Sequence, residues 1–534
     1  MPTRRTVLAG TAATVAAAGA GALALDRDEP IPGTLGGADA KRGHRLRTGP
    51  FPAPTRTEHT KVAIIGGGIA GLAAAWALAD AEIAFTLLEL EDHAGGNARA
   101  GRNAVSAYPL GAHYLPIPNA EATGVVRLLE RLGIVTGRQD GKPVFDPYQV
   151  VADPDERLLH LGRWQEGLVP TIGLNPADRH DLDAFFAAME TYRHRTGSDG
   201  RPAFALPMAL SSRDADLLAL DRLSFTDWLH AQGWRSPMLH AHVRYACRDD
   251  YGTEPQHCSA WAGIHYWAGR RGVAANVAGD AVLTWPEGNG HLAGRMAARV
   301  RDRIAPDRLV FRIAREGDGV AIDSLASDGI AVRTRADAAI LATPHFVTTR
   351  LLGQGPAQGF GYAPWLVANV TVDRPPAGPG TQLAWDNVSW TSRSLGYVVA
   401  THQSLASTPG PTVLTWYMPL SDSDPHAARR ELLARPLDHW QRQVRDDLLA
   451  TNPDLAGAIR RIDVWRWGHA MIRPVPGFFF GGARDAAAAP KPPLFFAHAD
   501  LSGLSLFEEA HYRGTKAAED AMAMLGVTFA SSLA

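Results

Sequence analysis

Residues 61–97 limit what this chain can fold into more than any other stretch. A short apolar run at 62–65 predicts a buried parallel strand, and the Ala- and Leu-rich residues after it predict a helix. Gly66, Gly68 and Gly71 lie between the two with the spacing GxGxxG. A strand that turns into a helix through this spacing is typical of a dinucleotide-binding α/β fold.

Each part of this turn has a physical role. Gly66 allows the tight turn, Gly68 lets the backbone approach a pyrophosphate, and Gly71 lets the helix pack closely against the strand. The helix begins near Ile69 and Ala70, and its free N–H groups and positive dipole end face the phosphates. The sequence therefore predicts a pyrophosphate site at this turn.

The next strand supports the same interpretation. A second apolar run at 85–88 ends in Glu89. A carboxylate that binds the ribose is expected about 20 residues after the glycines. The alternative is a glycine-rich loop without a ligand, and it leaves Glu89 and both strands without an explanation.

Gly95 and Gly96 indicate which dinucleotide is bound. From Glu89 onward the chain resembles the flavin amine oxidase superfamily, which includes protoporphyrinogen oxidases and phytoene-type desaturases and continues with a pattern similar to ExxxRxGGR. His93 and Asn97 stand where that family usually has arginines, while both glycines match. The resemblance implies FAD, with contacts from Gly95, Gly96 and Asn97.

Three further segments are similar to this family. Residues 108–114 resemble the segment beside the isoalloxazine ring, which implies contacts from Gly111, Ala112, His113 and Tyr114. Residues 494–500 predict a buried strand that ends in Asp500 and leads through Leu501 to a helix over 510–525, and the resemblance places both residues on the ribityl or pyrophosphate side. The strands around 307–343 resemble the part beside the adenine, which implies packing of Ile313 on the cofactor.

The resemblance implies an α/β fold of the glutathione-reductase type, with a Rossmann-like FAD-binding domain interrupted by an α+β substrate domain. At 534 residues the chain is long enough for both. The predicted FAD-binding segments are 58–119, 281–345 and 483–534, and the predicted substrate-domain segments are 120–280 and 346–482. Residues 26–57 are rich in Pro, Gly and charge and predict a linker.

The resemblance also implies the chemistry. A substrate C–H bond transfers a hydride to flavin N5, the substrate is a small molecule, most simply an amine, and O2 or a membrane quinone reoxidises the flavin. The candidate catalytic residues are Trp385, Trp467 and His469. Two alternatives stay open: a desaturase or isomerase for an apolar substrate, and a non-catalytic FAD-binding accessory protein. The aromatic-rich residues 245–267 could line the substrate pocket or form plain core.

Two absences from the sequence refine this picture. The five lysines are at 41, 61, 142, 491 and 516, so none lies in the substrate-domain segment where amine oxidases place a lysine near N5. No cysteine lies within 465–482, where some relatives attach flavin covalently, so FAD is expected to bind non-covalently.

The N-terminus resembles a twin-arginine export signal. Arg4 and Arg5 precede an Ala- and Gly-rich run, so residues 1–25 predict a signal peptide and a periplasmic or other extracytoplasmic protein without a stable membrane anchor. Export would permit a Cys247–Cys258 disulfide, although two buried free thiols are equally compatible with the sequence. A net charge of −2 indicates no nucleic-acid partner, and no Cys/His spacing indicates a metal site.

Overall fold

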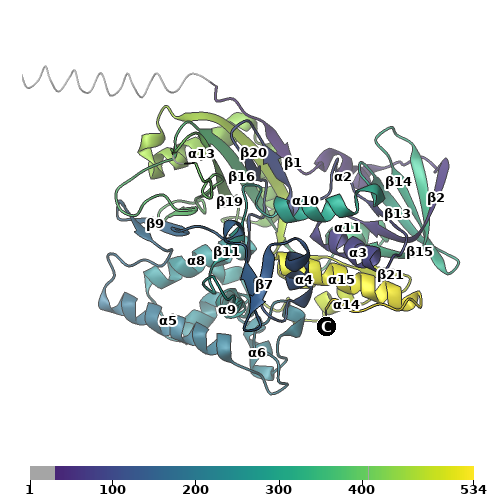
Figure 1. The fold of residues 1–534 in the computed structure, drawn as a ribbon, viewed down its shortest axis with the longest axis horizontal. Helices are drawn as coiled ribbons and strands as arrows, with labels where there is room; N and C mark the ends of the chain where they lie inside the picture. The colour runs from purple at the N-terminus through teal and green to yellow at the C-terminus, as the bar shows by residue number, and fades with distance from the viewer. Residues whose placement is uncertain (1–29, 407, 534) are drawn as a thin grey trace, which may run out of the picture.

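The structure is a computed structural model that describes residues 30–406 and 408–533, and in it the chain forms two large β-sheets side by side (Figure 1). One sheet is mostly parallel and carries the glycine-rich turn, while the other is larger and mostly antiparallel. Each sheet collects segments that are far apart in the sequence. The predicted α/β fold, a Rossmann-like domain beside an α+β domain, is confirmed.

The parallel sheet is built around β2 (Arg56–Ile65) and β15 (Ala331–Leu341), which pair in parallel. Its other strands are β3 (Phe85–Leu88), β12 (Ile304–Ala305), β13 (Leu309–Glu316), β14 (Gly319–Leu325) and β21 (Leu494–Phe496). Val62 to Ile65 of β2 are all buried, as expected for a parallel strand covered on both faces. These strands come from the three segments predicted to bind FAD, except that β2 begins two residues earlier.

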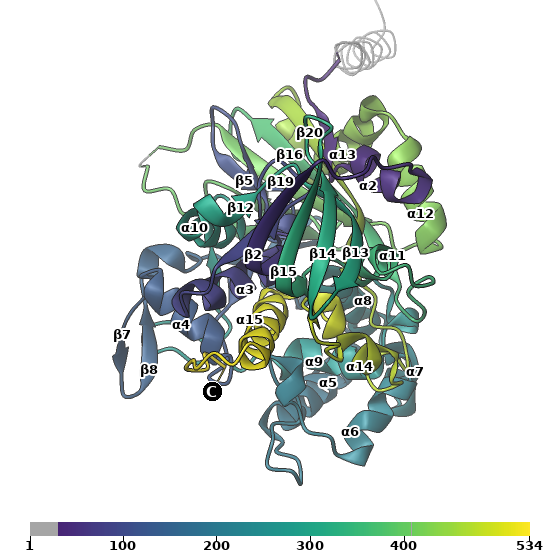
Figure 2. The same ribbon diagram turned by 90° about the vertical axis from the view of Figure 1, so that its right-hand side faces the viewer.

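Two helices pack together beside this sheet (Figure 2). α3 (Ile69–Asp80) follows β2, and α15 (Phe507–Met524) brings the C-terminal part of the chain against it. Gly514 of α15 lies so close to Ala70 that any side chain at Gly514 would collide with the Ala70 carbonyl oxygen. α3 is buried on nearly every side because the sheet, α15 and α10 (Gly290–Arg299) all cover it.

The mixed sheet is organised by β16 (Tyr362–Val372), which lies between β19 (Thr412–Pro419) and β20 (Ile459–Ile472). The remaining strands are β1 (Leu35–Gly37), β9 (Glu156–His160), β10 (Arg163–Glu166), β17 (Asp386–Ser389) and β18 (Tyr397–Val399). Side chains of β16 alternate between two cores. One core packs against α13 (Leu437–Thr451), and the other is aromatic and faces the parallel sheet's segment around residue 110.

A separate helical layer completes the substrate side. Its helices are α5 (Pro176–His194), α6 (Ala215–Ala219), α7 (Phe225–Ala231), α8 (Pro237–Tyr251) and α9 (Ala260–Ala268). Their core is rich in aromatic rings, including Tyr251 and Trp261, which are almost fully buried. Tyr245, Tyr266 and Trp267 instead line a cavity, so the aromatic-rich segment divides between core and cavity lining.

Shorter elements join these layers. The helices are α4 (Thr123–Arg131), α11 (His345–Leu351), α12 (Pro425–Ala434) and α14 (Ala483–Ala488). The strands are β4 (Ala100–Arg102), β5 (Ala107–Pro109), β6 (Tyr114–Pro116), β7 (Val135–Gln139), β8 (Lys142–Phe145) and β11 (Val282–Thr284). β6 and β11 pair with each other and carry the chain between the two sheets.

The linker predicted over residues 26–57 is wrong for the part that the structure describes. β1 pairs in parallel with β20, and α2 (Ala40–Thr48) follows at once. Asp39 caps α2, because its side chain accepts a hydrogen bond from the Arg42 N–H. Gly36, which suggested flexibility, instead permits close packing, since a side chain there would collide with the Trp465 ring. The predicted export signal lies outside the described residues.

Three further observations concern residues 30–406 and 408–533. No helix there is both long and apolar enough to cross a membrane. No group of three or more potential metal ligands comes together there. Cys247 and Cys258 are buried as free thiols, and burial raises the pKa of Cys247 well above its usual value.

Candidate functional site

Two glycine-rich segments meet at the ends of β2 and β3. The Gly95 N–H donates to the Gly67 carbonyl oxygen over 2.8 Å. Gly96 faces Gly68, and a Cβ at Gly96 would lie only 3.1 Å from the Gly68 Cα. Gly66 and Gly96 have φ values of +103° and +54°, which glycine adopts without strain. The two turns therefore require glycine for contact as well as for conformation.

The N-terminus of α3 fits a pyrophosphate. Gly68 is its N-cap, no side chain caps it, and its first turn carries no acidic residue. Ile69, Ala70 and Gly71 are nonetheless buried. Buried helix N–H groups without a side-chain partner require an acceptor, and together with the helix dipole they favour an anion. The predicted contacts of Gly66, Gly68, Ile69, Ala70 and Gly71 are compatible with this arrangement.

Glu89 lies directly beside this turn. One carboxylate oxygen accepts from the Gly67 N–H over 2.5 Å, and the other accepts from the Glu91 N–H over 2.9 Å. Burial raises the pKa of Glu89, and the two N–H donors oppose that shift. Each oxygen keeps a free lone pair for a hydroxyl group, so the position suits the predicted ribose contact.

His93 and Asn97 stand where the family usually has arginines, and they make other contacts here. The guanidinium of Arg99 binds the His93 ring over 3.1 Å and the carboxylates of Glu91 and Asp92 over 3.1 and 2.8 Å. Asn97 donates from Nδ2 to the Ala470 carbonyl oxygen on β20. The loop is thus tied to the mixed sheet, and its one buried guanidinium is two residues beyond Asn97.

The segment from Gly111 to Tyr114 reaches the substrate side. The Ala112 N–H donates to the Asn97 carbonyl oxygen, and the Tyr417 hydroxyl donates to the Gly111 carbonyl oxygen. The His113 ring stacks on Tyr417 at 4.5 Å between centroids. Burial lowers the pKa of His113 to about 4, so the ring is neutral at neutral pH.

The C-terminal acid is already held by the protein. Asp500 accepts from the His345 N–H over 2.9 Å and from the Tyr362 hydroxyl over 2.7 Å, and His498 contacts its other oxygen. The Leu501 carbonyl oxygen accepts from Arg484 and Arg513. Ile313 packs in the core between the sheet and α11. Cofactor contacts from Asp500, Leu501 and Ile313 stay predictions.

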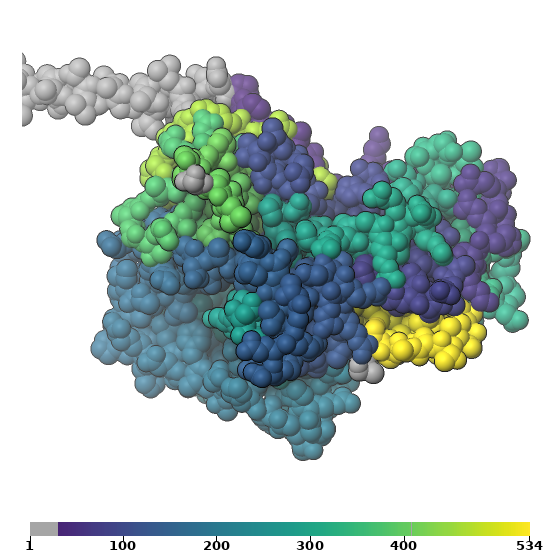
Figure 3. All heavy atoms as spheres, viewed as in Figure 1, coloured from purple at the N-terminus to yellow at the C-terminus, as the bar shows by residue number. Residues whose placement is uncertain are grey.

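His113 and Tyr114 line a cavity of about 190 Å³. α8, α9, β9, β17 and the β6–β11 pair contribute its walls. In Figure 3 the teal segment after α9 lies in a hollow surrounded by blue residues, and residues 279–282 of this segment line the cavity. Its other lining residues include Glu156, Tyr245, Asp249, Tyr266, Trp267, Arg270, Trp385 and Asp386.

Five carboxylates line this cavity, and none of them forms an ion pair in the described chain; three of them, those of Glu156, Asp249 and Asp386, have strongly raised pKa values. Arg270 forms its ion pair with Asp250, and within the described chain no Lys, Arg or His pairs with Glu156, Asp249 or Asp386. Burial raises the pKa values of Asp249 and Glu156 to about 7 and that of Asp386 well above its usual value, and neighbouring carboxylates add to the shifts, while Arg270 opposes those of Asp249 and Glu156. Asp249 and Glu156 therefore titrate near neutral pH.

The structure separates the three candidate catalytic residues. Trp385 lines the cavity, and its ring lies 5.6 Å from that of His113. Trp467 lies behind the 108–114 segment, where its Nε1 donates to the Leu110 carbonyl oxygen. His469 stacks on Phe346 at 4.2 Å and is not among the cavity-lining residues. Burial lowers the pKa of His469 to about 3. His469 therefore lies apart from Trp385, and the catalytic roles of the three residues stay predictions.

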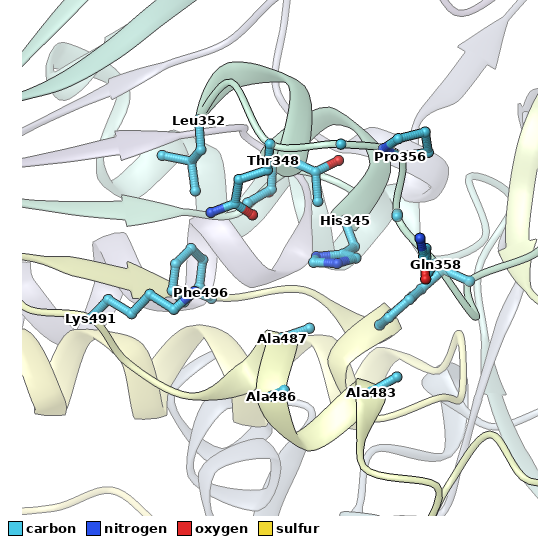
Figure 4. A pocket seen from close by; sticks show the side chains of 15 residues that line it. His345, Thr348, Leu352, Pro356, Gln358, Ala483, Ala486, Ala487, Lys491 and Phe496 are labelled. Carbon is cyan, nitrogen blue, oxygen red and sulfur yellow. The ribbon is translucent and has the colours of Figure 1, made fainter.

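A second cavity, of about 370 Å³, lies at the edge of the parallel sheet. Figure 4 shows His345 and Thr348 of α11 facing Phe496 and the alanines of α14 across it. It contains Lys491 but no carboxylate. The His345 N–H connects this cavity to a predicted cofactor residue, because it donates to the Asp500 carboxylate.

The family profile described as flavin containing amine oxidoreductase matches residues 69–522, which include α3, the cavity walls and most of α15. The chain belongs to this family. As a flavin-containing amine oxidoreductase it is an FAD-dependent oxidoreductase, and the cofactor contacts of the α3 N-terminus and Glu89 stay predictions. Among curated proteins no sequence match was found.

Solved structures share this fold at low sequence identity. A putrescine oxidase double mutant covers 88% of this chain and 100% of its own, with 15% identity and a TM-score of 0.66. Cyclohexylamine oxidase from Brevibacterium oxydans IH-35A covers 88% and 99%, with 17% identity and a TM-score of 0.62. A fatty acid isomerase from P. acnes covers 87% and 98%, with 16% identity and a TM-score of 0.58.

Sequence reasoning missed the carboxylates of the cavity. Asp386 lies beside the predicted Trp385, whereas Glu156 and Asp249 carry no local signal because they are ordinary acids on a strand and a helix. Only the fold brings them together. An indirect signal existed in the Asp249–Asp250 pair, since two adjacent acids in a mostly buried helix require partners on two different faces.

Replacing Glu89 with Ala is expected to reduce bound FAD at least about tenfold, since it removes a buried hydrogen-bonded acceptor and leaves the Gly67 N–H unpaired. The flavin absorbance of purified protein measures this. Asp337→Asn is the control, because Asp337 is a half-exposed acid of the same sheet. Equal flavin content in Glu89→Ala and wild type would contradict the assignment of Glu89.

Proposed function

We propose that this protein oxidises a small cationic amine in the cavity between His113 and the three carboxylates. The observation that carries the proposal is the set of Glu156, Asp249 and Asp386, which line one cavity without a cationic partner in the described chain. Buried carboxylates are costly unless a positive charge compensates them. An ammonium group supplies that charge.

The cavity walls support a cation as well. Tyr245, Tyr266, Trp267 and Trp385 present aromatic rings, whose faces attract cations. Two arginines line the cavity as well. Arg270 lies over the Tyr266 ring at 4.4 Å and forms an ion pair with Asp250, and Arg193 forms an ion pair with Glu190. An apolar chain would leave the three carboxylates unsolvated, so this cavity favours an amine oxidase over a desaturase or isomerase. A dedicated charged cavity also favours an enzyme over a non-catalytic accessory protein.

The chain's own residues position the amine and take its proton. FAD, when bound, accepts the hydride from the amine's α-carbon. An amine must lose its ammonium proton before it can give up that hydride, and a carboxylate with a pKa near 7 is suited to receive it. Asp249 and Glu156 meet this requirement. Since no lysine lines the cavity, these two acids are the groups that accept the proton, and the His113 ring beside them is neutral.

Anaerobic mixing with a panel of amines tests the function. Small mono- and diamines are expected to bleach the flavin absorbance near its visible maximum, whereas fatty acids and carotenoid-like hydrocarbons leave it unchanged. Adding O2 or a soluble quinone to the bleached protein then identifies the electron acceptor. If an apolar substrate bleaches the flavin and no amine does, the proposal is wrong and the desaturase alternative is favoured.

Asp386→Asn and Asp249→Asn are expected to raise KM for a cationic amine at least about tenfold, since losing a buried charged partner costs about 2–5 kcal/mol. In the wild type, KM falls as pH rises through about 7, because Asp249 and Glu156 become ionised and hold the cation more strongly. Steady-state kinetics across this range measures both effects.

Asp280→Asn is the matched control, because Asp280 also lines the cavity but is exposed to solvent. If KM changes neither with pH nor in the Asp249→Asn and Asp386→Asn variants, the amine does not bind as a cation beside these groups.

We also propose export by the twin-arginine route. Arg4, Arg5 and the Ala- and Gly-rich run after them support it, as does the advantage of folding around FAD before translocation. A fusion of residues 1–40 to a reporter is expected to reach the periplasm and to remain in the cytoplasm when both arginines are replaced by lysine. Export of the double-lysine fusion would exclude this route.

A further inference from the structure

Residues 31–48 cross from one sheet to the other (Figures 1 and 2). We name them the N-terminal strap. The first half of the strap contains β1 and belongs to the mixed sheet, and the second half contains α2 and reaches the end of β3 in the parallel sheet. It thus spans the junction at which the FAD-binding turn lies.

The strap is fixed to the mixed sheet along β20. Ile462 and Val464 donate their N–H groups to the carbonyl oxygens of Pro32 and Thr34, and Thr34 binds the Asp463 carboxylate from both its N–H and its hydroxyl. Gly36 then passes directly over the Trp465 ring, in a space that admits no side chain.

The strap is fixed to the parallel sheet just beyond Glu89. The Asp39 N–H donates to the Glu91 carboxylate over 2.8 Å. Arg42 donates to the Leu90 carbonyl oxygen over 2.7 Å and to both the carbonyl and the carboxylate of Asp307, at 2.7 and 3.0 Å. Three acceptors on two segments hold this one guanidinium, which is three-quarters buried.

Arg99 closes the ring of contacts. Its guanidinium binds the other oxygen of Glu91 and lies over the Trp465 ring at 5.6 Å. We name residues 89–99 the cofactor loop. A continuous series of contacts joins this loop to the strap, and it runs through Gly36, Trp465, Arg99, Glu91 and Asp39. This loop contains Glu89, Gly95, Gly96 and Asn97.

The cofactor loop depends on such contacts because it has little structure of its own. Residues 89–95 belong to no helix or strand, and only a single 3₁₀ turn follows at Gly96–Ala98. A segment without its own hydrogen-bond ladder opens at low free-energy cost unless neighbours hold it. Loop opening separates Gly96 from Gly68 and exposes the pyrophosphate end of the site.

We propose that the N-terminal strap is part of the FAD-binding site: it locks the cofactor loop closed and sets the rate at which FAD leaves. The strap contributes no chemistry to the reaction. Arg42 and Asp39 act through the loop as positioning residues. Gly36 allows β1 to pack closely against the Trp465 ring.

The test uses the holoprotein without substrate, so its outcome is independent of which amine is oxidised. FAD release after dilution is followed by the rise in flavin fluorescence. The double variant Gly36→Ala/Arg42→Ala is expected to release FAD at least about tenfold faster than wild type, which corresponds to about 1.4 kcal/mol of loop stabilisation. Release at the wild-type rate overturns the proposal.

Matched variants separate the strap from general destabilisation. Lys41→Ala alters α2 without touching its anchors, because Lys41 is exposed. Leu432→Ala weakens the core of the mixed sheet away from the loop. Both are expected to release FAD at the wild-type rate. If Leu432→Ala accelerates release as much as the double variant, the strap has no specific role. Should the double variant not fold, Arg42→Ala alone gives the same comparison.

Discussion

The backbone contact between Gly95 and Gly67 is the constraint on which the rest of the site depends. It brings the end of β3 against the start of α3, with Gly96 facing Gly68. Because neither segment can carry a side chain there, the two turns close around the open N-terminus of α3. Glu89 then lies on one side of the turn and Asn97 on the other, where it binds β20. The predicted cofactor site therefore lies at the junction of the two sheets.

Local sequence patterns were sufficient to predict this half of the molecule. The apolar runs at 62–65 and 85–88, with glycines between them, correspond to β2, α3 and β3. The strap resembled a linker because glycine and charge occur both in flexible segments and in segments that pack closely against a neighbour.

The substrate half could not be predicted in the same way, since its chemistry arises from the assembly of distant segments. Asp249 and Asp250 illustrate the reason. A helix turns by about 100° per residue, so Asp250 reaches Arg270 while Asp249 lines the cavity. The two identical neighbours in the sequence therefore differ in the structure: Asp250 forms an ion pair, and Asp249 does not. Glu156 and Asp386 join Asp249 only because β9 and β17 pair in the mixed sheet.

The packing of α15 on α3 has a consequence for how the protein is made. Gly514 must lie against Ala70 before the helix that presents the pyrophosphate site is fully enclosed, and β21 must pair with β15. Both contacts come from the last strand and the last helix of the described chain, so α3 becomes fully enclosed only after these two elements have been synthesised and have packed.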